Sequence, residues 1–189
     1  MIYLFDHKVL FYHIPKTAGG SITFWLKNYN NGANALIEPL HMMPWRVGKY
    51  NLDVKWSFCV VRNPWERWVS WWWYWKNIAK KIDYSFEEYT EKFFNKEFVG
   101  MESQGGQYGT CVPQSYYFAH VDEILRYENL EEDFKKVQSK LGNSSPLEKV
   151  ANISKNKQDY RNYYTNPRLV DMINDFYRED VIQLGYKYE

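Results

Sequence analysis

The chain has 189 residues, enough for one domain with a hydrophobic core and too few for two domains of ordinary size. It is 45% hydrophobic and 25% charged, as in a soluble globule, and it has neither an apolar run of roughly 20 residues nor a signal-peptide pattern. These features exclude a membrane span and predict a cytoplasmic location, while the net charge of +1 excludes a broad electrostatic attraction to nucleic acid.

The first predicted elements are a strand, a turn and a helix. Residues 9–14 form a short apolar and aromatic run that ends at Pro15, which favours a strand. Residues 16–20 contain two glycines and predict a turn, and Ser21 is expected to cap the helix that follows. A second short strand is expected at residues 35–37.

A buried strand and a long helix are predicted next. The strand covers residues 55–61 and includes Cys59, whose thiol is expected to be buried and reduced, because two cysteines do not make a disulfide scaffold. Asn63 is expected to cap a helix that runs to about Lys80. Pro64 would occupy its first position, where a missing N–H costs nothing.

A further helix and a long loop follow. The spacing predicts a helix over residues 85–94, with a capping box between Ser85 and Glu88. Residues 96–113 contain four glycines and end in a proline, so they are expected to be a long loop. Loops of this length within a small domain are often functional.

The last third of the chain completes an alternation of strands and helices. A strand is expected at residues 123–127, and Asn129 is expected to cap a helix over residues 130–141. Residues 152–163 are polar and basic and predict a second loop, and Asn166-Pro167 begins the last helix. The alternation predicts an α/β fold, a single-domain three-layer sandwich around a central parallel sheet over residues 1–189.

The turn after the first strand has the properties of an anion site. Lys16 supplies a positive charge, Thr17 and Ser21 offer hydroxyl donors, and Gly19 and Gly20 let backbone N–H groups face inward at a helix N-terminus. In the P-loop of nucleotide triphosphatases the lysine follows the glycines, whereas Lys16 precedes them. The alternative is an ordinary strand–helix turn with a solvated lysine.

A second cation follows the 55–61 strand. Arg62 lies at the carboxyl end of that strand, where α/β sheets bind ligands, and a guanidinium there can hold a phosphate through two hydrogen bonds. Ser70 shares the helix face that includes Asn63, so it is expected to reach the same anion. Arg67 fits a surface or ion-paired cation as well as a ligand. The opposite helix face carries a stripe expected to be core: Trp65, Trp68, Trp72 and Trp75.

Four segments together resemble one enzyme family. Residues 11–22 read FYHIPKTAGGSI and residues 59–70 read CVVRNPWERWVS; residues 126–130 and 163–186 add weaker similarity in the same order. The chain resembles the sulfotransferases that use 3′-phosphoadenosine 5′-phosphosulfate (PAPS), and it is most similar to their carbohydrate (heparan/chondroitin-type) branch. The resemblance implies a P-loop-like PAPS-binding turn, 3′,5′-bisphosphoadenosine as product and no metal.

The resemblance assigns roles to individual residues. Lys16 would stabilise the bridging oxygen of the leaving group, and Arg62 and Ser70 would hold the 3′-phosphate. Ser154 and Lys155 would lie in a basic loop that closes over that end. The 5′-phosphosulfate would be held by Lys16 and the turn that follows it: Thr17, Ala18, Gly19, Gly20, Ser21 and Ile22.

The acceptor needs a base, for which His41 is the main candidate. His41 lies between the two motifs, where related carbohydrate enzymes place a catalytic histidine; the alternative is a packed or surface histidine. His13 is beside the anion turn and is interpreted as a packing residue. The 20% aromatic content suits a saccharide acceptor, while peptidyl tyrosine, a lipid and a small phenol stay open.

Two other functions are kept as alternatives. An ATP-dependent P-loop kinase would need Mg²⁺, and no predicted core strand leads into the aspartate that would hold it. A non-catalytic glycan-binding module would use the aromatic side chains and would have no need of two cationic sites.

Overall fold

The computed structural model describes residues 1–29, 35–37, 41–97, 111–148 and 158–189. Its contacts divide the chain into two units. Unit 1 comprises Met1–Arg62 and Gln114–Ala151, and unit 2 comprises Asn63–Pro113 and Asn152–Glu189. The expectation of a single domain over the whole chain stays a prediction, and each unit is described by itself.

Unit 1 contains a five-stranded sheet in the order β3-β1-β2-β4-β5. The strands are β1 (Ile2–Leu4), β2 (Val9–Tyr12), β3 (Ala35–Ile37), β4 (Trp56–Val61) and β5 (Glu123–Arg126). Strands β2, β4 and β5 pair in parallel, whereas β1 pairs antiparallel with both β2 and β3. The α/β class is confirmed. The predicted parallel pairing is found for β2, β4 and β5, whereas the antiparallel strand β1 was not predicted.

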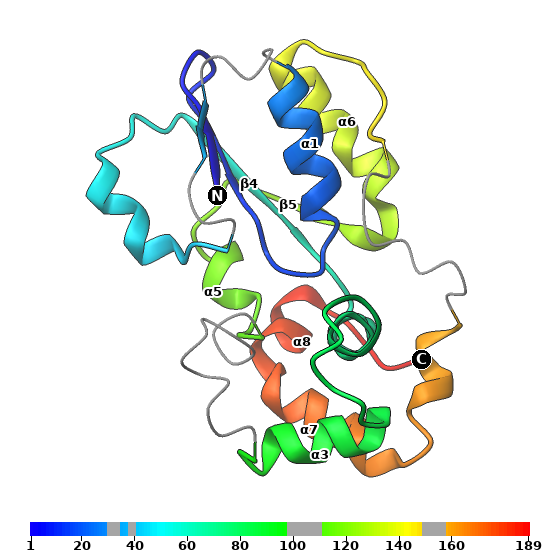
Figure 1. Cartoon of the computed structure of the whole chain (residues 1–189). Coiled ribbons are helices and arrows are strands. Elements are labelled where there is room, and N and C mark those ends of the chain that lie inside the picture. The colour runs from blue at the N-terminus through cyan, green and yellow to red at the C-terminus, as the bar shows by residue number, and fades with distance from the viewer. Residues whose placement is uncertain (30–34, 38–40, 98–110, 149–157) are drawn as a thin grey trace. The chain divides into compact units, whose positions relative to one another are not determined.

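Two helices pack on one face of this sheet. Helices α1 (Gly19–Tyr29) and α6 (Leu130–Leu141) lie side by side (Figure 1), with the Trp25 and Phe134 rings in edge contact at 5.0 Å. Alternate strand residues, including Phe11, Phe58 and Val60, face the same cluster, as the two-residue period of a strand requires. The described part of unit 1 also includes short helical segments: η1 (Pro44–Tyr50), α5 (Ser115–Phe118) and η4 (Tyr127–Asn129). The three-layer arrangement stays a prediction.

Unit 2 is helical (Figure 1), and its helices pack around an aromatic core. Its elements are α2 (Pro64–Trp73), the π-turn η2 (Tyr74–Ile78), α3 (Phe86–Phe94), η5 (Tyr160–Tyr163), α7 (Pro167–Phe176) and α8 (Arg178–Leu184). Of the expected tryptophan stripe, Trp65 and Trp68 are buried, while Trp72 and Trp75 are half-buried against the core. Trp71 on another face is also buried, so the packed arc of α2 is wider than one stripe.

The predicted helix starts in unit 2 are confirmed. The Asn63 side chain accepts hydrogen bonds from the N–H groups of Trp65 and Glu66 at 3.0 and 3.2 Å. The capping box between Ser85 and Glu88 is present. Asn166 caps α7, although α7 is not the last helix, since α8 follows it. The long helix begins at Pro64 as expected and ends in a π-turn at Ile78, two residues before the predicted end.

Two predicted caps in unit 1 were wrong. Helix α1 begins at Gly19, so Ser21 lies inside its first turn. Asn129 makes no side-chain cap on α6, because its amide instead donates to the Asp133 carboxylate at 3.0 Å. Cys59 is buried and free, as expected. Through the described ranges, no helix combines the length and the apolar character that a membrane crossing requires.

Candidate active site

The turn between β2 and α1 is held in an uncommon backbone conformation. Lys16 and Ala18 have φ angles of 68° and 65°, in the left-handed region that side chains disfavour by roughly 1–2 kcal/mol per residue. The Thr17 hydroxyl donates to the Ile14 carbonyl at 2.8 Å and stabilises the turn. Residues held in such conformations cluster at functional sites.

The turn presents backbone N–H groups at a helix N-terminus. In the part of the chain that the structure describes, the N–H groups of Thr17, Ala18, Gly19 and Gly20 have no hydrogen-bond acceptor. Helix α1 has 11 residues, so its N-terminal end carries a partial positive charge. Donors and charge together make this turn suited to an anion.

Three groups expected to contact an anion are engaged within the turn instead. The N–H groups of Ser21 and Ile22 donate to the Ala18 carbonyl at 3.0 and 3.3 Å. The Thr17 side chain is fully buried on Ile14, so its hydroxyl does not point outward as a donor. The donors best placed for an anion are therefore the preceding four amides.

Lys16 is a half-buried cation in this turn. Burial, and then the nearby positive charge of Arg62, lowers the pKa of Lys16 to about 8. The protonated amine still predominates at neutral pH, but its charge is poorly solvated. An anion bound next to it would relieve that cost, because an opposite charge favours the protonated form.

Arg62 lies beside Lys16 and is firmly positioned. It is 5% exposed, and its Nη1 donates to the Lys16 carbonyl at 3.0 Å. Its guanidinium lies over the Tyr127 ring, 4.1 Å from the centroid. The Gln114 side-chain amide accepts from the Arg62 N–H and donates to the Arg62 carbonyl, both at 2.9 Å. Since β2 and β4 are adjacent parallel strands, the cations that follow them meet at one edge of the sheet.

His41 lies next to the carboxyl end of β2, where it contacts His13. Its Nδ1 is 3.2 Å from the His13 carbonyl, and its ring contacts the His13 ring edge-on with centroids 4.6 Å apart. Because a carbonyl only accepts, this bond requires a proton on Nδ1, and in the neutral ring Nε2 then carries the lone pair. The Tyr117 hydroxyl donates to the His41 carbonyl at 3.2 Å. The structure therefore gives His41 the tautomer that a general base at Nε2 needs.

His13 contacts both His41 and the anion turn. It is 6% exposed, and a Cβ added at Gly19 would lie 1.8 Å from its Cδ2, so the ring rests directly on that glycine. Burial, followed by the charge of His41, holds the pKa of His13 well below its usual value, and the ring is neutral. These contacts agree with the interpretation of His13 as a packed residue.

The other predicted site residues belong to unit 2 or lie outside the described residues. Ser70 is on α2 in unit 2, and its sharing of an anion with Arg62 stays a prediction. Arg67 is fully buried and donates to the Val112 carbonyl at 3.1 Å, so of the alternatives left open for it a surface cation is excluded. Ser154 and Lys155 lie outside the described residues.

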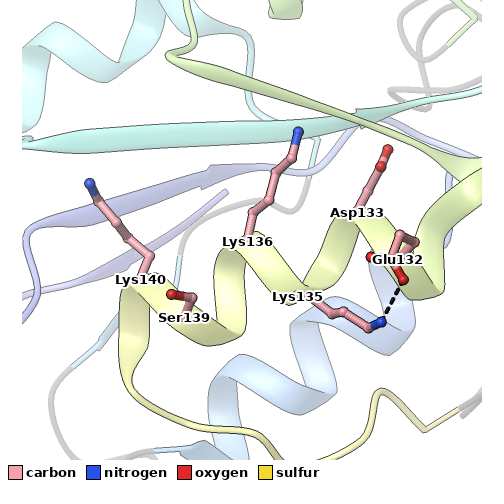
Figure 2. Close-up of a pocket in the computed structure, with 6 residues that line it drawn as sticks. All are labelled: Glu132, Asp133, Lys135, Lys136, Ser139 and Lys140. Carbon is pink, nitrogen blue, oxygen red and sulfur yellow. Dashed lines mark hydrogen bonds and ion pairs between the residues drawn. The ribbon is translucent and has the colours of Figure 1, made fainter.

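A shallow hollow on α6, unlike the anion turn, is lined by charged surface side chains (Figure 2). Six side chains of that helix line it: Glu132, Asp133, Lys135, Lys136, Ser139 and Lys140. Lys135 pairs with Glu132 at 2.5 Å and Lys136 with Glu123 at 2.7 Å, so these charges form solvated surface pairs. Across the described ranges, no three His, Cys, Asp or Glu side chains are grouped to hold a metal ion.

Sequence comparisons agree with the site. The profile of a family described as "Sulfotransferase family" matches residues 1–187. An uncharacterized protein of Archaeoglobus fulgidus is 38% identical to this chain over 104 residues, which cover 55% of this chain and 82% of that protein. With two cations and a row of amide donors meeting at one sheet edge, and a family match across nearly the whole length, this chain belongs to the sulfotransferase family.

Proposed function

We propose that the protein transfers the sulfuryl group of PAPS to a hydroxyl group of a saccharide. The observation that carries the proposal is the meeting of Lys16, Arg62 and the N–H groups of residues 17–20 at the ends of two neighbouring strands. A doubly anionic nucleotide that needs no metal fits such a group of donors. Family membership supports sulfuryl transfer as the chemistry.

The donor has two anionic ends, and the residues divide between them. In this proposal, the amides of residues 17–20 and the Lys16 ammonium hold the 5′-phosphosulfate, as helix N-termini hold phosphates. Arg62 holds the 3′-phosphate, for which a guanidinium offers two parallel N–H donors. Ser70 assists Arg62, and Ser154 and Lys155 close over the same end.

The reaction follows from these positions. The acceptor hydroxyl gives its proton to Nε2 of His41 while its oxygen forms a bond to sulfur. The bond between sulfur and the bridging oxygen breaks, and the electron pair stays on that oxygen, which leaves with 3′,5′-bisphosphoadenosine. The Lys16 ammonium stabilises the charge that develops there. As in phosphoryl transfer, most of the catalysis comes from positioning and charge stabilisation.

The two alternatives have less support. An ATP-dependent kinase of the P-loop type places its lysine after the glycines and binds Mg²⁺, whereas Lys16 precedes Gly19 and Gly20. A glycan-binding module has no use for two desolvated cations, whose burial opposes folding.

The test is transfer of labelled sulfate. Incubation with ³⁵S-labelled PAPS and a panel of oligosaccharides should give a labelled saccharide and 3′,5′-bisphosphoadenosine. His41→Ala should abolish transfer yet keep the binding of bisphosphoadenosine, measured by thermal shift. The proposal is wrong if ATP with Mg²⁺ stabilises the protein and bisphosphoadenosine does not. If His41→Ala turns over like the wild type, His41 is not the base.

A further inference from the structure

Two aromatic side chains of unit 1 are conspicuously exposed. Trp45 on η1 is 65% exposed, and Tyr116 on α5 is 48% exposed. Their rings meet edge-to-face, with centroids 6.2 Å apart and planes at 69°. Tryptophan usually buries most of its large surface, so an indole left in solvent against a second ring is an uncommon arrangement.

The segments that carry these two rings are both connected to the candidate base. Trp45 follows His41 by four residues, a chain distance of at most about 14 Å. Tyr116 precedes Tyr117, whose buried hydroxyl donates to the His41 carbonyl at 3.2 Å. The segments that carry the two rings are therefore both linked to His41, one through the chain and one through a hydrogen bond.

We propose that Trp45 and Tyr116 form the acceptor subsite, against which the C–H face of a pyranose ring packs; this inference rests on the proposed function. One face of such a ring is apolar while its rim carries hydroxyls, so it can cover an indole and keep its hydroxyls hydrated. A phenol or a lipid chain gains most from an enclosed apolar pocket. Trp45 and Tyr116 present an open surface, which also lets a longer saccharide extend beyond the ring that reacts.

The experiment compares Trp45→Ala and Tyr116→Ala with a matched control, Phe5→Ala. Phe5 is 46% exposed in the turn before β2, at the opposite end of that strand from the anion turn. Each subsite variant should raise the acceptor KM for heparosan and chondroitin oligosaccharides about 5–10-fold, from the loss of one aromatic contact. The KM for PAPS and the affinity for bisphosphoadenosine should not change. Phe5→Ala should match the wild type in all three.

A binding measurement that needs no turnover separates this inference from the proposed function. The Trp45 indole N–H signal, assigned by its absence in Trp45→Phe, should shift on addition of the same oligosaccharides and not of 4-nitrophenol. Unchanged acceptor KM in both variants, or a signal that responds to the phenol alone, overturns the subsite. If the signal shifts with oligosaccharide but bisphosphoadenosine does not bind, the subsite stands and the proposed donor is wrong.

Discussion

In unit 1 several buried polar side chains lie around the turn between β2 and α1, whereas in unit 2 buried polar side chains support an aromatic core. His13, Thr17 and Arg62 of unit 1 are all buried at or beside that turn, which also contains two residues with positive φ. In unit 2 the Tyr177 hydroxyl donates to the Cys111 carbonyl at 2.6 Å, and the Trp68 indole N–H donates to Thr90 at 2.9 Å. Buried polar side chains therefore belong to the candidate site in unit 1, whereas in unit 2 they form hydrogen bonds within the packed core.

Replacing a core tryptophan of unit 2 should cause the largest loss of stability. Trp68 is fully buried, and its ring contacts those of Tyr89, Phe93 and Tyr177. Trp68→Ala should lower the free energy of unfolding by about 3–5 kcal/mol, from lost burial and the cavity left behind. Urea denaturation measures this loss. The exposed Trp45→Ala is the control and should change stability by no more than about 0.5 kcal/mol; equal losses would contradict the assignment of these roles.

Replacing the lysine of the turn should affect turnover far more than stability. Lys16→Ala should lower kcat by about 10²–10³-fold, the usual effect of removing one charge-stabilising donor from a transition state. The KM for PAPS should rise much less, because the bridging oxygen gains its charge as the bond breaks. Steady-state kinetics separates the two parameters. A loss of donor affinity as large as the loss of kcat would contradict this role for Lys16.

Disturbing the contact between Gly19 and His13 should reduce stability and ligand binding by an intermediate amount. In Gly19→Ala the new methyl group would overlap the His13 ring, so the turn or the ring must move, at a cost of about 1–3 kcal/mol. Bisphosphoadenosine should bind more weakly as the amides shift. Gly48→Ala is the matched control, because a Cβ there meets nothing within 4 Å. In His13→Ala/Gly19→Ala the penalties should be less than additive, and strict additivity in thermal unfolding would exclude the contact.

Donor binding should also depend on pH through Lys16. With a folded-state pKa of about 8, Lys16 is protonated below pH 8 and loses its charge above it. Bisphosphoadenosine affinity should thus be greatest near pH 7 and fall several-fold by pH 9.5, a range in which its phosphates keep a constant charge. Calorimetric titration should show a bend near pH 8 that is absent in Lys16→Met.

The lowered pKa of Lys16 affects stability in the opposite direction from donor binding. Because the folded pKa lies below the ordinary 10.5, the unfolded chain binds more protons between about pH 8 and 10.5. This group therefore makes the protein more stable as pH rises through that window, while donor binding weakens. A loss of stability over the same range in the wild type, relative to Lys16→Met, would contradict the shift.

Sequence patterns predicted the elements whose signals are local. Strands β2 and β4 are apolar runs with clear ends, and the caps at Asn63 and Ser85 use residues close in the chain. The antiparallel strand β1 was not predicted, although β3, which has the same length, was. Helix α1 begins at Gly19 rather than after Ser21, and α6 begins at Leu130 as predicted but without the Asn129 side-chain cap, because side-chain partners, not residue type alone, decide a cap.

The part of the site that was predicted is the part marked by charged residues directly after apolar strands. Lys16 and Arg62 follow apolar strands, so their meeting at one sheet edge was foreseeable. Gln114 was missed, because the Arg62 backbone that it holds is 52 residues away and nothing local marks the pair. The His41 tautomer likewise depends on a carbonyl 28 residues away.

The central claim is that Lys16 and Arg62 hold opposite ends of one nucleotide, and calorimetry with two ligands tests it most directly. Arg62→Lys should weaken 3′,5′-bisphosphoadenosine about tenfold and leave the affinity for 5′-AMP unchanged, because only the former carries a 3′-phosphate. Lys16→Ala should weaken both ligands. Equal losses for both ligands in Arg62→Lys, or no loss for either, would contradict the account.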